Sequence, residues 1–212
     1  MTRTLVVDAR RPEPDVLAAA AAVLAEEGLV AFPTESFYGL GAHALSASAV
    51  ARVFDVKGRP ADKPLLVLVA STQGAEALCS AMPDGVRDLM ARHWPGPLTL
   101  VLPAVPGLPP ALTAGTGTIG LRVPDHPVAL GLVRAAGAPV TAPSANPSGA
   151  PPPTSADRVR DYFGSRIDLV LDGGITTGGT GSTVADCTVW PPRILRAGPI
   201  AIPGAVAVEA GA

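Results

Sequence analysis

The sequence predicts a single α/β domain, and three observations lead to this fold class. Short apolar runs, typical of buried strands, alternate with longer segments whose apolar residues recur at helical spacing. Apolar residues make up 48% and charged residues 16% of the 212 residues, which excludes a disordered chain and fits one domain. No internal repeat or linker divides the chain. We expect a mixed, twisted β-sheet with flanking helices over residues 1–212, with a core from about residue 5 to residue 200 and a short C-terminal tail.

In the first half of the chain, apolar runs indicate strands, and capping residues indicate where helices begin and end. Asp15 and Ser46 are suitable N-caps, and Gly28 and Gly58 stand where a glycine commonly follows a helix. In chain order we expect a strand at Leu5–Val7, a helix at Asp15–Glu27, a strand at Leu29–Phe32, a loop at Pro33–Gly41, a helix at Ala47–Val56, a strand at Leu65–Val69, and helical segments at Gln73–Ala81 and Pro83–His93.

The second half continues the alternation. Asp125 is the expected cap of a helix that ends at Ala136, and Thr154 or Ser155 is the expected cap of a helix that ends at Phe163. Strands are expected at Leu98–Leu102, Thr118–Val123, Pro139–Thr141, Ile167–Leu171, Thr183–Asp186 and Arg193–Arg196.

Composition and charge exclude several functional classes. Sixteen basic against eighteen acidic residues give a net charge of −2, which disfavours a general nucleic-acid binder. Cys79 and Cys187 are far apart and favour buried thiols over a disulfide, and the three histidines are too scattered for a zinc site. The most apolar stretch, Val16–Ala25, is about half of the length that a bilayer requires, and no signal segment precedes it. We expect a soluble, cytoplasmic protein without membrane contact.

Three loops of similar composition follow apolar strands and combine Ser, Thr, Asn, Gly and Pro. Such loops are often simple turns, but in α/β sheets ligands collect beyond strand ends, where backbone N–H groups and hydroxyls are free. Three loops of one kind favour a shared site. They are Pro33–Gly41, Thr141–Gly149 and Gly178–Thr183.

Cationic residues supply a second signal. Lys57, Arg59 and Lys63 lie in a segment made rigid by two prolines. They fit either the cations that stabilise a helix C-terminus or a polyphosphate clamp, and this stretch alone favours neither. Arg122 stands within an apolar run, and it is open whether its side chain faces solvent or the interior. The same alternatives apply to Arg196. If Arg122 faces inward, it must meet an anion, and a carboxylate is the natural partner.

Catalytic motifs with a nucleophile are missing from the sequence. There is no GxxxxGK[ST] loop, no GxGxxG after the first strand and no GxSxG elbow. Glu35, Asp125, Asp172 and Asp186 are possible bases, although capping or turn roles explain Asp125 and Asp172 equally well. The residues therefore indicate a site that positions substrates and neutralises their charge.

In its ordered motifs, the chain resembles the YrdC-type L-threonylcarbamoyladenylate synthases from about Leu5 to Gly198. The matching segments are Pro33–Gly41, Lys57–Leu68, Trp94–Thr99, Arg122–Pro124, Ser144–Asn146 with Ser148–Gly149, Ser182–Val184 and Ile194–Gly198. The resemblance implies a YrdC-like α/β domain with an open cationic cavity. Some relatives continue into a separate C-terminal domain, and from its length we expect this chain to lack one.

The resemblance also implies an enzyme, a nucleotidyltransferase that makes threonylcarbamoyl-AMP and pyrophosphate from L-threonine, bicarbonate or CO2, and ATP. The product serves the threonylcarbamoyladenosine modification of tRNA, through downstream threonylcarbamoyl-transfer proteins and with possible weak tRNA contact. Mg2+ is expected with the phosphates, and no protein metal site or covalent nucleophile is implied. Implied threonine-binding residues are Thr34, Arg122 and Ser182, and implied ATP-binding residues are Lys57, Arg59, Lys63, Thr118, Ser144, Asn146 and Arg196.

Two other functions stay open at this point. The cations could line a groove for RNA in a protein without nucleotidyl transfer, although 4% aromatic residues offer little for base stacking. A related enzyme could make carbamoyl-adenylate from carbamoyl phosphate. Members of that kind usually belong to larger chains with zinc-finger cysteines, and this sequence has no such cysteines.

Overall fold

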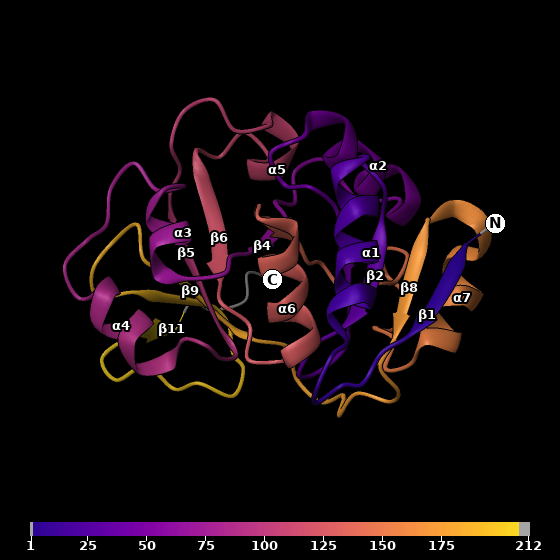
Figure 1. Ribbon diagram of the computed structural model, residues 1–212. Helices are drawn as coiled ribbons and strands as arrows, with labels where there is room; N and C mark the ends of the chain where they lie inside the picture. Colours follow the sequence, from indigo (N-terminus) through magenta and orange to yellow (C-terminus); the bar gives the residue numbers. More distant parts are fainter. Residues whose placement is uncertain (1, 208–212) are drawn as a thin grey trace.

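The computed structural model describes residues 2–207 and confirms the α/β fold class (Figure 1). Among these residues no helix combines the length and the apolar character needed to cross a bilayer. In chain order the elements are β1 (Arg3–Val6), α1 (Pro14–Ala25), β2 (Val30–Pro33), β3 (Tyr38–Gly41), α2 (Ala47–Lys57), β4 (Leu66–Leu68), α3 (Thr72–Glu76), α4 (Val86–His93), β5 (Leu98–Pro103), α5 (Pro110–Thr113), β6 (Thr118–Arg122), α6 (Pro127–Ala136), β7 (Val140–Thr141), α7 (Ala156–Phe163), a 3-10 turn (Gly164–Arg166), β8 (Leu169–Asp172), β9 (Thr183–Asp186), β10 (Arg193–Arg196) and β11 (Val206–Ala207).

The strands form two hydrogen-bonded sheets, where the sequence led us to expect one. A four-stranded sheet has the order β1-β8-β2-β3, and a seven-stranded sheet has the order β11-β10-β9-β5-β6-β4-β7. Both are mixed: β2 runs parallel to β8 but antiparallel to β3, and β6 runs parallel to β4 but antiparallel to β5. Isolated bridges from Gly39 to Ser144 and from His43 to Val140 join the edge strand β3 to the chain around β7. The two sheets therefore meet edge to edge along β3.

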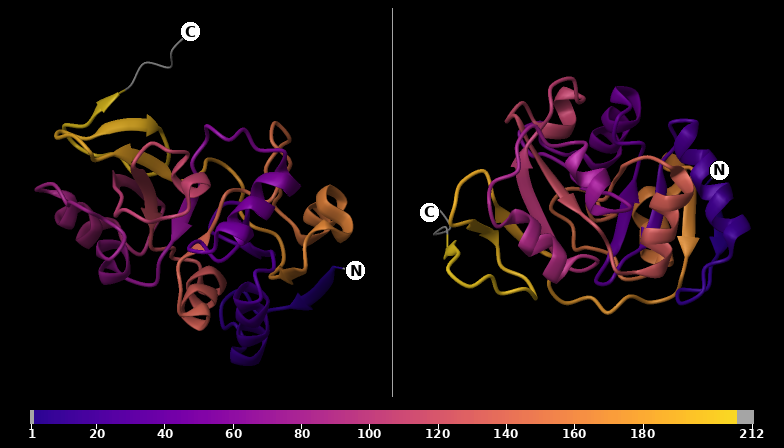
Figure 2. Two further views of the ribbon diagram at one scale, coloured as in Figure 1. Left: turned by 90° about the horizontal axis from the view of Figure 1, so that it is seen from above. Right: turned by 60° about the vertical axis from the view of Figure 1, so that its left-hand side comes forward.

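Helices cover both faces of the four-stranded sheet. Successive residues of a strand point to opposite faces, so Val30 and Phe32 pack with one hydrophobic cluster and Ala31 packs with the other. The first cluster includes α1 and α6, which lie side by side in Figures 1 and 2. Their contact is close at Gly131, where a Cβ atom would lie 2.7 Å from Cδ1 of Leu17. Residues of α2 and α7 belong to the second cluster.

Several predicted helix ends are confirmed. Ser46 accepts a hydrogen bond from the N–H of Ala49, Ser155 accepts one from the N–H of Arg158, and Gly58 adopts a left-handed conformation with φ of 57°.

Three other predicted helix ends are wrong. The N-cap of α1 is Glu13, not Asp15, because Pro14 occupies the first helical turn and places Asp15 inside it. At the other end Glu27, not Gly28, has the positive φ of 61°. A glycine is required at position 28 because a side chain would not fit there: a Cβ atom would lie 2.5 Å from Cγ1 of Val23. His126, not Asp125, caps α6, because its Nδ1 accepts from the N–H of Val128.

The segment expected as a loop at Pro33–Gly41 contains the strand β3. Its glycines resemble a turn in sequence, but in the structure they allow close packing, because a Cβ atom at Gly41 would lie 2.9 Å from the Phe32 ring and from Val140. The short elements α5 and β11 also lay outside our expectations, and the expected helix at Gln73–Ala81 is shortened to α3.

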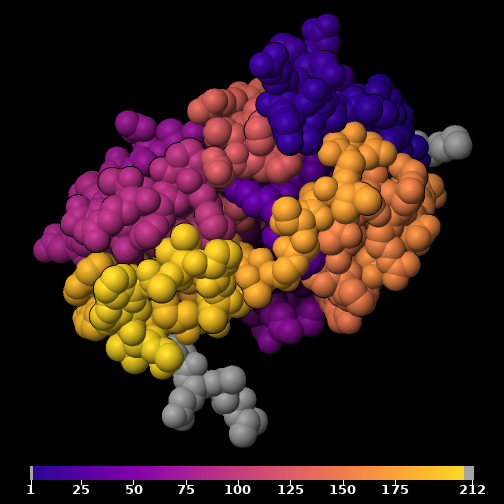
Figure 3. Space-filling view, turned by 90° about the horizontal axis from the view of Figure 1, so that it is seen from below, coloured from indigo at the N-terminus to yellow at the C-terminus, as the bar shows by residue number. Residues whose placement is uncertain are grey.

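The connection from β8 to β9 crosses between the two sheets without a helix. Residues 173–182 leave β8 in the four-stranded sheet and enter β9 in the seven-stranded sheet, and we call this segment the strap. Figure 2 shows it running along one side of the molecule. In the space-filling view of Figure 3 the strap passes beside a hollow between the two halves of the protein.

Candidate active site

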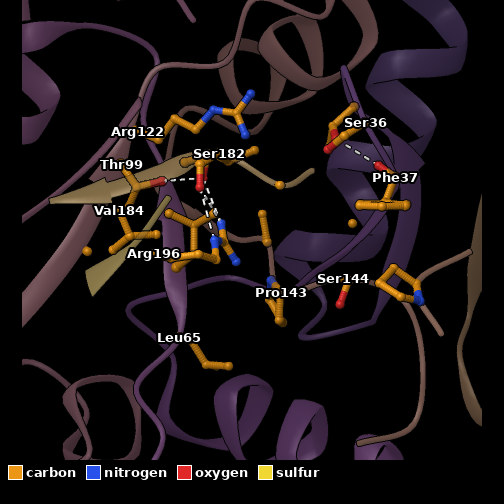
Figure 4. A pocket seen from close by; sticks show the side chains of 18 of the residues that line it. Ser36, Phe37, Leu65, Thr99, Arg122, Pro143, Ser144, Ser182, Val184 and Arg196 are labelled. Carbon is orange, nitrogen blue, oxygen red and sulfur yellow. Dashed lines mark hydrogen bonds between the residues drawn. The ribbon is translucent and has the colours of Figure 1, made fainter. Parts of the chain in front are cut away.

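A cavity of about 530 Å³ lies between the two sheets. One wall comes from strands of the seven-stranded sheet, with Thr99 of β5, Arg122 of β6 and Ser182 just before β9. The other wall comes from the β2–β3 loop and from the loop after β7, which carries Ser144. Figure 4 shows these two sets of side chains facing the same space. The three loops that the sequence singled out therefore meet at one cavity.

The structure brings together most of the residues expected in a site. Seven of them line the cavity: Thr34, Arg59, Thr118, Arg122, Ser144, Ser182 and Arg196. Lys57, Lys63 and Asn146 do not line it. Three guanidinium groups on a cavity of this size favour an anionic ligand.

Arg122 faces inward and meets a carboxylate from its own chain. Its side chain is 6% exposed, and its Nη2 forms an ion pair with Oε2 of Glu35 in the β2–β3 loop. Its Nε donates to the carbonyl oxygen of Gly96 at 2.8 Å. The sequence predicted that an inward Arg122 must pair with an anion, and Glu35 is that anion in this structure.

Glu35 is held in its charged form. Burial by itself would raise the pKa of this carboxyl, but the Arg122 charge and hydrogen bonds outweigh burial and lower the pKa below its ordinary value. One of those bonds is donated by the backbone N–H of Asp125 to Oε1 of Glu35 at 2.5 Å. Glu35 is therefore an anion beside Arg122 at neutral pH and is poorly suited to the role of a base there.

Ser182 and Arg196 contact one another directly. Nη2 of Arg196 donates to the Oγ of Ser182 at 3.0 Å, and Nε and Nη2 both donate to its carbonyl oxygen. The Ser182 hydroxyl also lies 2.8 Å from the hydroxyl of Thr99, as the dashed lines of Figure 4 show. The residue expected to bind the amino acid and a residue expected to bind the nucleotide thus share one hydrogen-bond network.

Lys57 occupies a different place from the one expected of a phosphate ligand. It is the last residue of α2, it is 3% exposed, and its Nζ donates to the carbonyl oxygens of Ser144 and Asn146. Its own carbonyl oxygen accepts from the N–H of Ser148. Burial, and to a lesser degree the Arg59 charge, lowers the pKa of Lys57 to about 8. Its ammonium group secures the loop that carries Ser144.

The segment after α2 folds around Arg59. Its Nε donates to the carbonyl oxygen of Lys63 at 3.0 Å and its Nη2 to that of Pro64 at 2.8 Å. These bonds hold Arg59 at the cavity edge, whereas Lys63 is exposed at the surface. Thr118 also lines the cavity, with its hydroxyl 2.8 Å from that of Thr116.

Asn146 points into its own loop. Its amide nitrogen donates to the carbonyl oxygens of Pro147 at 2.9 Å and Ala150 at 2.7 Å. The side chain therefore shapes the loop behind Ser144. Thr34 plays a comparable part in the β2–β3 loop, where its hydroxyl donates to the carbonyl oxygen of Phe37 at 2.7 Å.

Sequence reasoning missed two groups of residues. Glu35 was considered only as a base, and Thr99 had no assigned role, since their partners come from distant parts of the chain. The apolar walls of the cavity were also missed, among them Phe37, Leu65 and Val184. The signal that could have found Thr99 is its alternation with Leu98 and Leu100 in a strand, which places it on the opposite face.

The other possible bases lie outside the cavity lining. Asp186 pairs with Arg193 and accepts from Thr188, which together outweigh burial and lower its pKa. Asp172 accepts from the N–H of Gly174, in the turn role that the sequence suggested. Both cysteines are free. Within residues 2–207 no group of three or more His, Cys, Asp or Glu side chains is arranged to hold a metal ion.

These features define what the cavity can do chemically. Fixed guanidinium groups can neutralise a carboxylate and a polyphosphate, and hydroxyls can orient both ligands. The arrangement suits a reaction between two bound substrates more than attack by a side chain of the protein.

Comparisons with known proteins give a consistent result. The sequence profile of a family named for Sua5, YciO and YrdC, and described as telomere recombination, matches residues 22–198. The threonylcarbamoyl-AMP synthase of Pyrococcus abyssi is 47% identical over 92% of this chain and 58% of its own length. A putative threonylcarbamoyl-AMP synthase of Mycobacterium tuberculosis is 42% identical over 94% of this chain and 92% of its own length.

A solved structure agrees with the fold as well. The crystal structure of P. abyssi Sua5 complexed with L-threonine superimposes with a TM-score of 0.89 at 47% identity, over 92% of this chain and 57% of that one. This chain thus spans a little more than half the length of the Pyrococcus protein.

Proposed function

The chain belongs to the Sua5/YciO/YrdC family, and from this premise we propose that it is an L-threonylcarbamoyladenylate synthase. Its substrates would be L-threonine, bicarbonate or CO2, and ATP, and its products threonylcarbamoyl-AMP and pyrophosphate. The observation that carries the proposal is the convergence of Arg59, Arg122 and Arg196 with the hydroxyls of Ser144 and Ser182 on one cavity of about 530 Å³. A site of this kind suits an amino acid beside a nucleoside triphosphate.

The residues divide between two subsites. Thr34, Arg122 and Ser182 would bind L-threonine, with Arg122 taking its carboxylate. Arg59, Ser144 and Arg196 would bind ATP, with Thr118 and Lys63 making smaller contributions. Lys57 and Asn146 would contribute to ATP binding by holding the Ser144 loop, since their polar groups are engaged with its backbone.

The proposed chemistry requires no covalent intermediate with the protein. The amine nitrogen of threonine bonds to the carbon of CO2 and loses a proton, which gives a carbamate. From bicarbonate, that proton leaves together with a hydroxide from the bicarbonate carbon as one water molecule. A carbamate oxygen then bonds to the α-phosphorus of ATP as the bond to the pyrophosphate oxygen breaks. The protein holds the substrates together, which is worth up to about 7–11 kcal/mol in well-oriented reactions. Its guanidinium groups neutralise the charge on phosphorus and on the departing pyrophosphate.

Mg2+ would enter with ATP. Since the described residues offer no carboxylate cluster, phosphate oxygens and water would supply its ligands, and the ion would neutralise phosphate charge. The product would supply a threonylcarbamoyl group to transfer proteins that modify an adenosine of tRNA. A cytoplasmic location fits this role.

The test is pyrophosphate release from ATP, with L-threonine and bicarbonate each left out in turn and the adenylate identified by mass spectrometry. We expect product only when all three substrates are present. Product formed from carbamoyl phosphate without threonine would indicate the carbamoyl-adenylate reaction. Salt-dependent tRNA binding without ATP consumption would indicate an RNA-binding protein.

A further inference from the structure

Glu35 is a partly buried charge that the proposed reaction does not use. Its side chain is 24% exposed and lines a small second cavity of about 190 Å³, which shares Arg122 and Ser182 with the main one. A carboxylate beside the cation that is meant to receive a substrate carboxylate requires an explanation, because the two anions compete for one guanidinium group.

The guanidinium group of Arg122 has three nitrogen atoms, and two of them contact other residues of the protein. Nε donates to the Gly96 carbonyl oxygen, and Nη2 pairs with Glu35. Within residues 2–207 no hydrogen bond or ion pair engages Nη1. This nitrogen is the donor left for a ligand in the cavity that Arg122 lines.

All three oxygen atoms of Glu35 have contacts within the protein. Oε2 contacts Arg122, Oε1 accepts from the N–H of Asp125, and the peptide oxygen accepts from the hydroxyl of Thr177 in the strap at 2.6 Å. The strap also binds the peptide oxygen of the next residue, Ser36, through Thr176 and Gly178. The position of the carboxylate is therefore fixed, and its ion pair with Arg122 restricts the long and flexible arginine side chain.

The pair also spans the two sheets. Glu35 lies in the β2–β3 loop of the four-stranded sheet, and Arg122 ends β6 in the seven-stranded sheet. A contact across the cavity sets the orientation of Arg122 relative to both walls, before any ligand binds. Such preorganisation increases affinity because less side-chain freedom is lost on binding.

We infer that Glu35 is a positioning residue for L-threonine, which holds Arg122 so that Nη1 is presented to the carboxylate of the amino acid. This inference rests on the proposed function and adds to it a residue that acts through Arg122. The paired charges of Glu35 and Arg122 leave little repulsion toward a second carboxylate.

The variant Glu35→Gln tests this role. A glutamine has the same shape, but an NH2 group replaces one of the two carboxylate oxygens and the negative charge is lost, so a donor would face either the N–H of Asp125 or Arg122. We expect the Kd for L-threonine, measured by calorimetry, to rise by about tenfold or more, and the KM for ATP to stay within about twofold of the wild-type value. The matched control is Glu76→Gln, which removes the exposed ion pair of Glu76 with Arg87 and should leave both constants unchanged.

A second ligand separates positioning from direct contact. L-threonine amide has the amine and hydroxyl of threonine but no carboxylate. If Glu35 acts through Arg122, the amide binds the wild type and Glu35→Gln equally well, because it has no carboxylate for Nη1. A comparable loss for the amide would mean that Glu35 contacts the amine itself, and the inference would be overturned.

Further outcomes would also overturn it. These are unchanged or tighter binding of L-threonine to Glu35→Gln, or equal losses for threonine and ATP. If Glu35→Gln fails to fold, Thr177→Val removes the bond from the strap to the Glu35 peptide while leaving the ion pair in place. That variant should weaken L-threonine binding by about twofold to fivefold and spare ATP, and no change would count against the inference.

Failure of this inference is distinguishable from failure of the proposed function. A wild-type protein that binds no L-threonine and forms no adenylate refutes the function. A wild-type protein that does both, with Glu35→Gln binding L-threonine as tightly, refutes the role of Glu35 alone.

Discussion

The ammonium group of Lys57 donates to the carbonyl oxygen of Ser144 at a distance of 2.5 Å, across 87 positions of sequence. A cation that would be assigned to phosphate binding from its sequence context instead ties the end of α2 to a loop of the cavity. The loop that carries Ser144, which belongs to the proposed nucleotide subsite, is thus held by a buried ammonium group, and this arrangement has consequences that can be measured.

Replacing Lys57 by Met should weaken ATP binding indirectly. The substitution keeps most of the side chain but leaves the carbonyl oxygens of Ser144 and Asn146 without their donor, which costs about 1–3 kcal/mol of stability. We expect a lower Tm together with a KM for ATP raised by about tenfold, and little change in the KM for L-threonine.

The exposed Lys63 provides the comparison. Lys63→Met should raise the KM for ATP without changing Tm, because the Lys63 side chain supports no loop. If Lys57→Met raised the KM for ATP at an unchanged Tm, Lys57 would have to contact the nucleotide directly.

Thr99 should control the hydroxyl of Ser182. Thr99→Val is close in shape but removes the hydroxyl that lies 2.8 Å from Ser182 Oγ. Since Arg196 binds the same oxygen, we expect losses of a few-fold in kcat/KM for both L-threonine and ATP, or about 0.5–1.5 kcal/mol. Steady-state kinetics check this, and Thr99→Ser, which retains the hydroxyl, should keep most of the wild-type rate. Equal losses in the two variants would point to packing as the cause.

Acid should weaken the fold through Glu35. The pKa of this carboxyl in the folded protein lies below 4.5, its ordinary value, so the unfolded chain binds its proton first as the pH falls. The stability due to the Glu35 charge is therefore fully present above about pH 4.5 and is lost as the pH falls through the folded-state pKa. Urea denaturation at several pH values should show a constant difference between wild type and Glu35→Gln above pH 4.5, and a shrinking difference below it. A difference that stays constant in acid would contradict the shifted pKa.

Gly198 should tolerate no side chain. A Cβ atom there would lie 2.4 Å from the backbone nitrogen of Thr183 and 2.6 Å from the carbonyl oxygen of Gly181, and backbone atoms cannot move aside readily. Gly198→Ala should therefore displace the strand end that carries Arg196, lower Tm by several degrees, and raise the KM for ATP.

Gly74→Ala is a suitable control for that experiment. Its Cβ atom would meet its nearest neighbour, Val69, at an ordinary contact distance of 3.5 Å, within the helix α3. Thermal denaturation should show no loss of stability. A Gly198→Ala protein as stable and active as this control would refute the close approach.

Several strands and helix ends of this protein could be predicted from the sequence. Apolar runs placed β8 and β9, and Ser46 and Ser155 capped their helices as expected, because a cap depends on atoms within three residues. The ordered motifs also identified the family, and the sequence predicted that Arg122 would meet an anion if it faced inward. Where two local signals competed, as at Pro14 with Asp15 and at Asp125 with His126, the expected cap was wrong.

The tertiary structure decided which atoms meet. Glu35 reaches Arg122, Lys57 reaches Ser144, and Thr99 reaches Ser182 only because two sheets join along β3 and the strap crosses between them. The strand β3 was not predicted for the same reason. Its glycines are typical of a turn in sequence, and only the pairing with β2 makes this segment a strand. Residue types and spacing determine what each side chain is able to bind. The partner it finds is set by contacts between distant segments, and these form only when the whole chain packs.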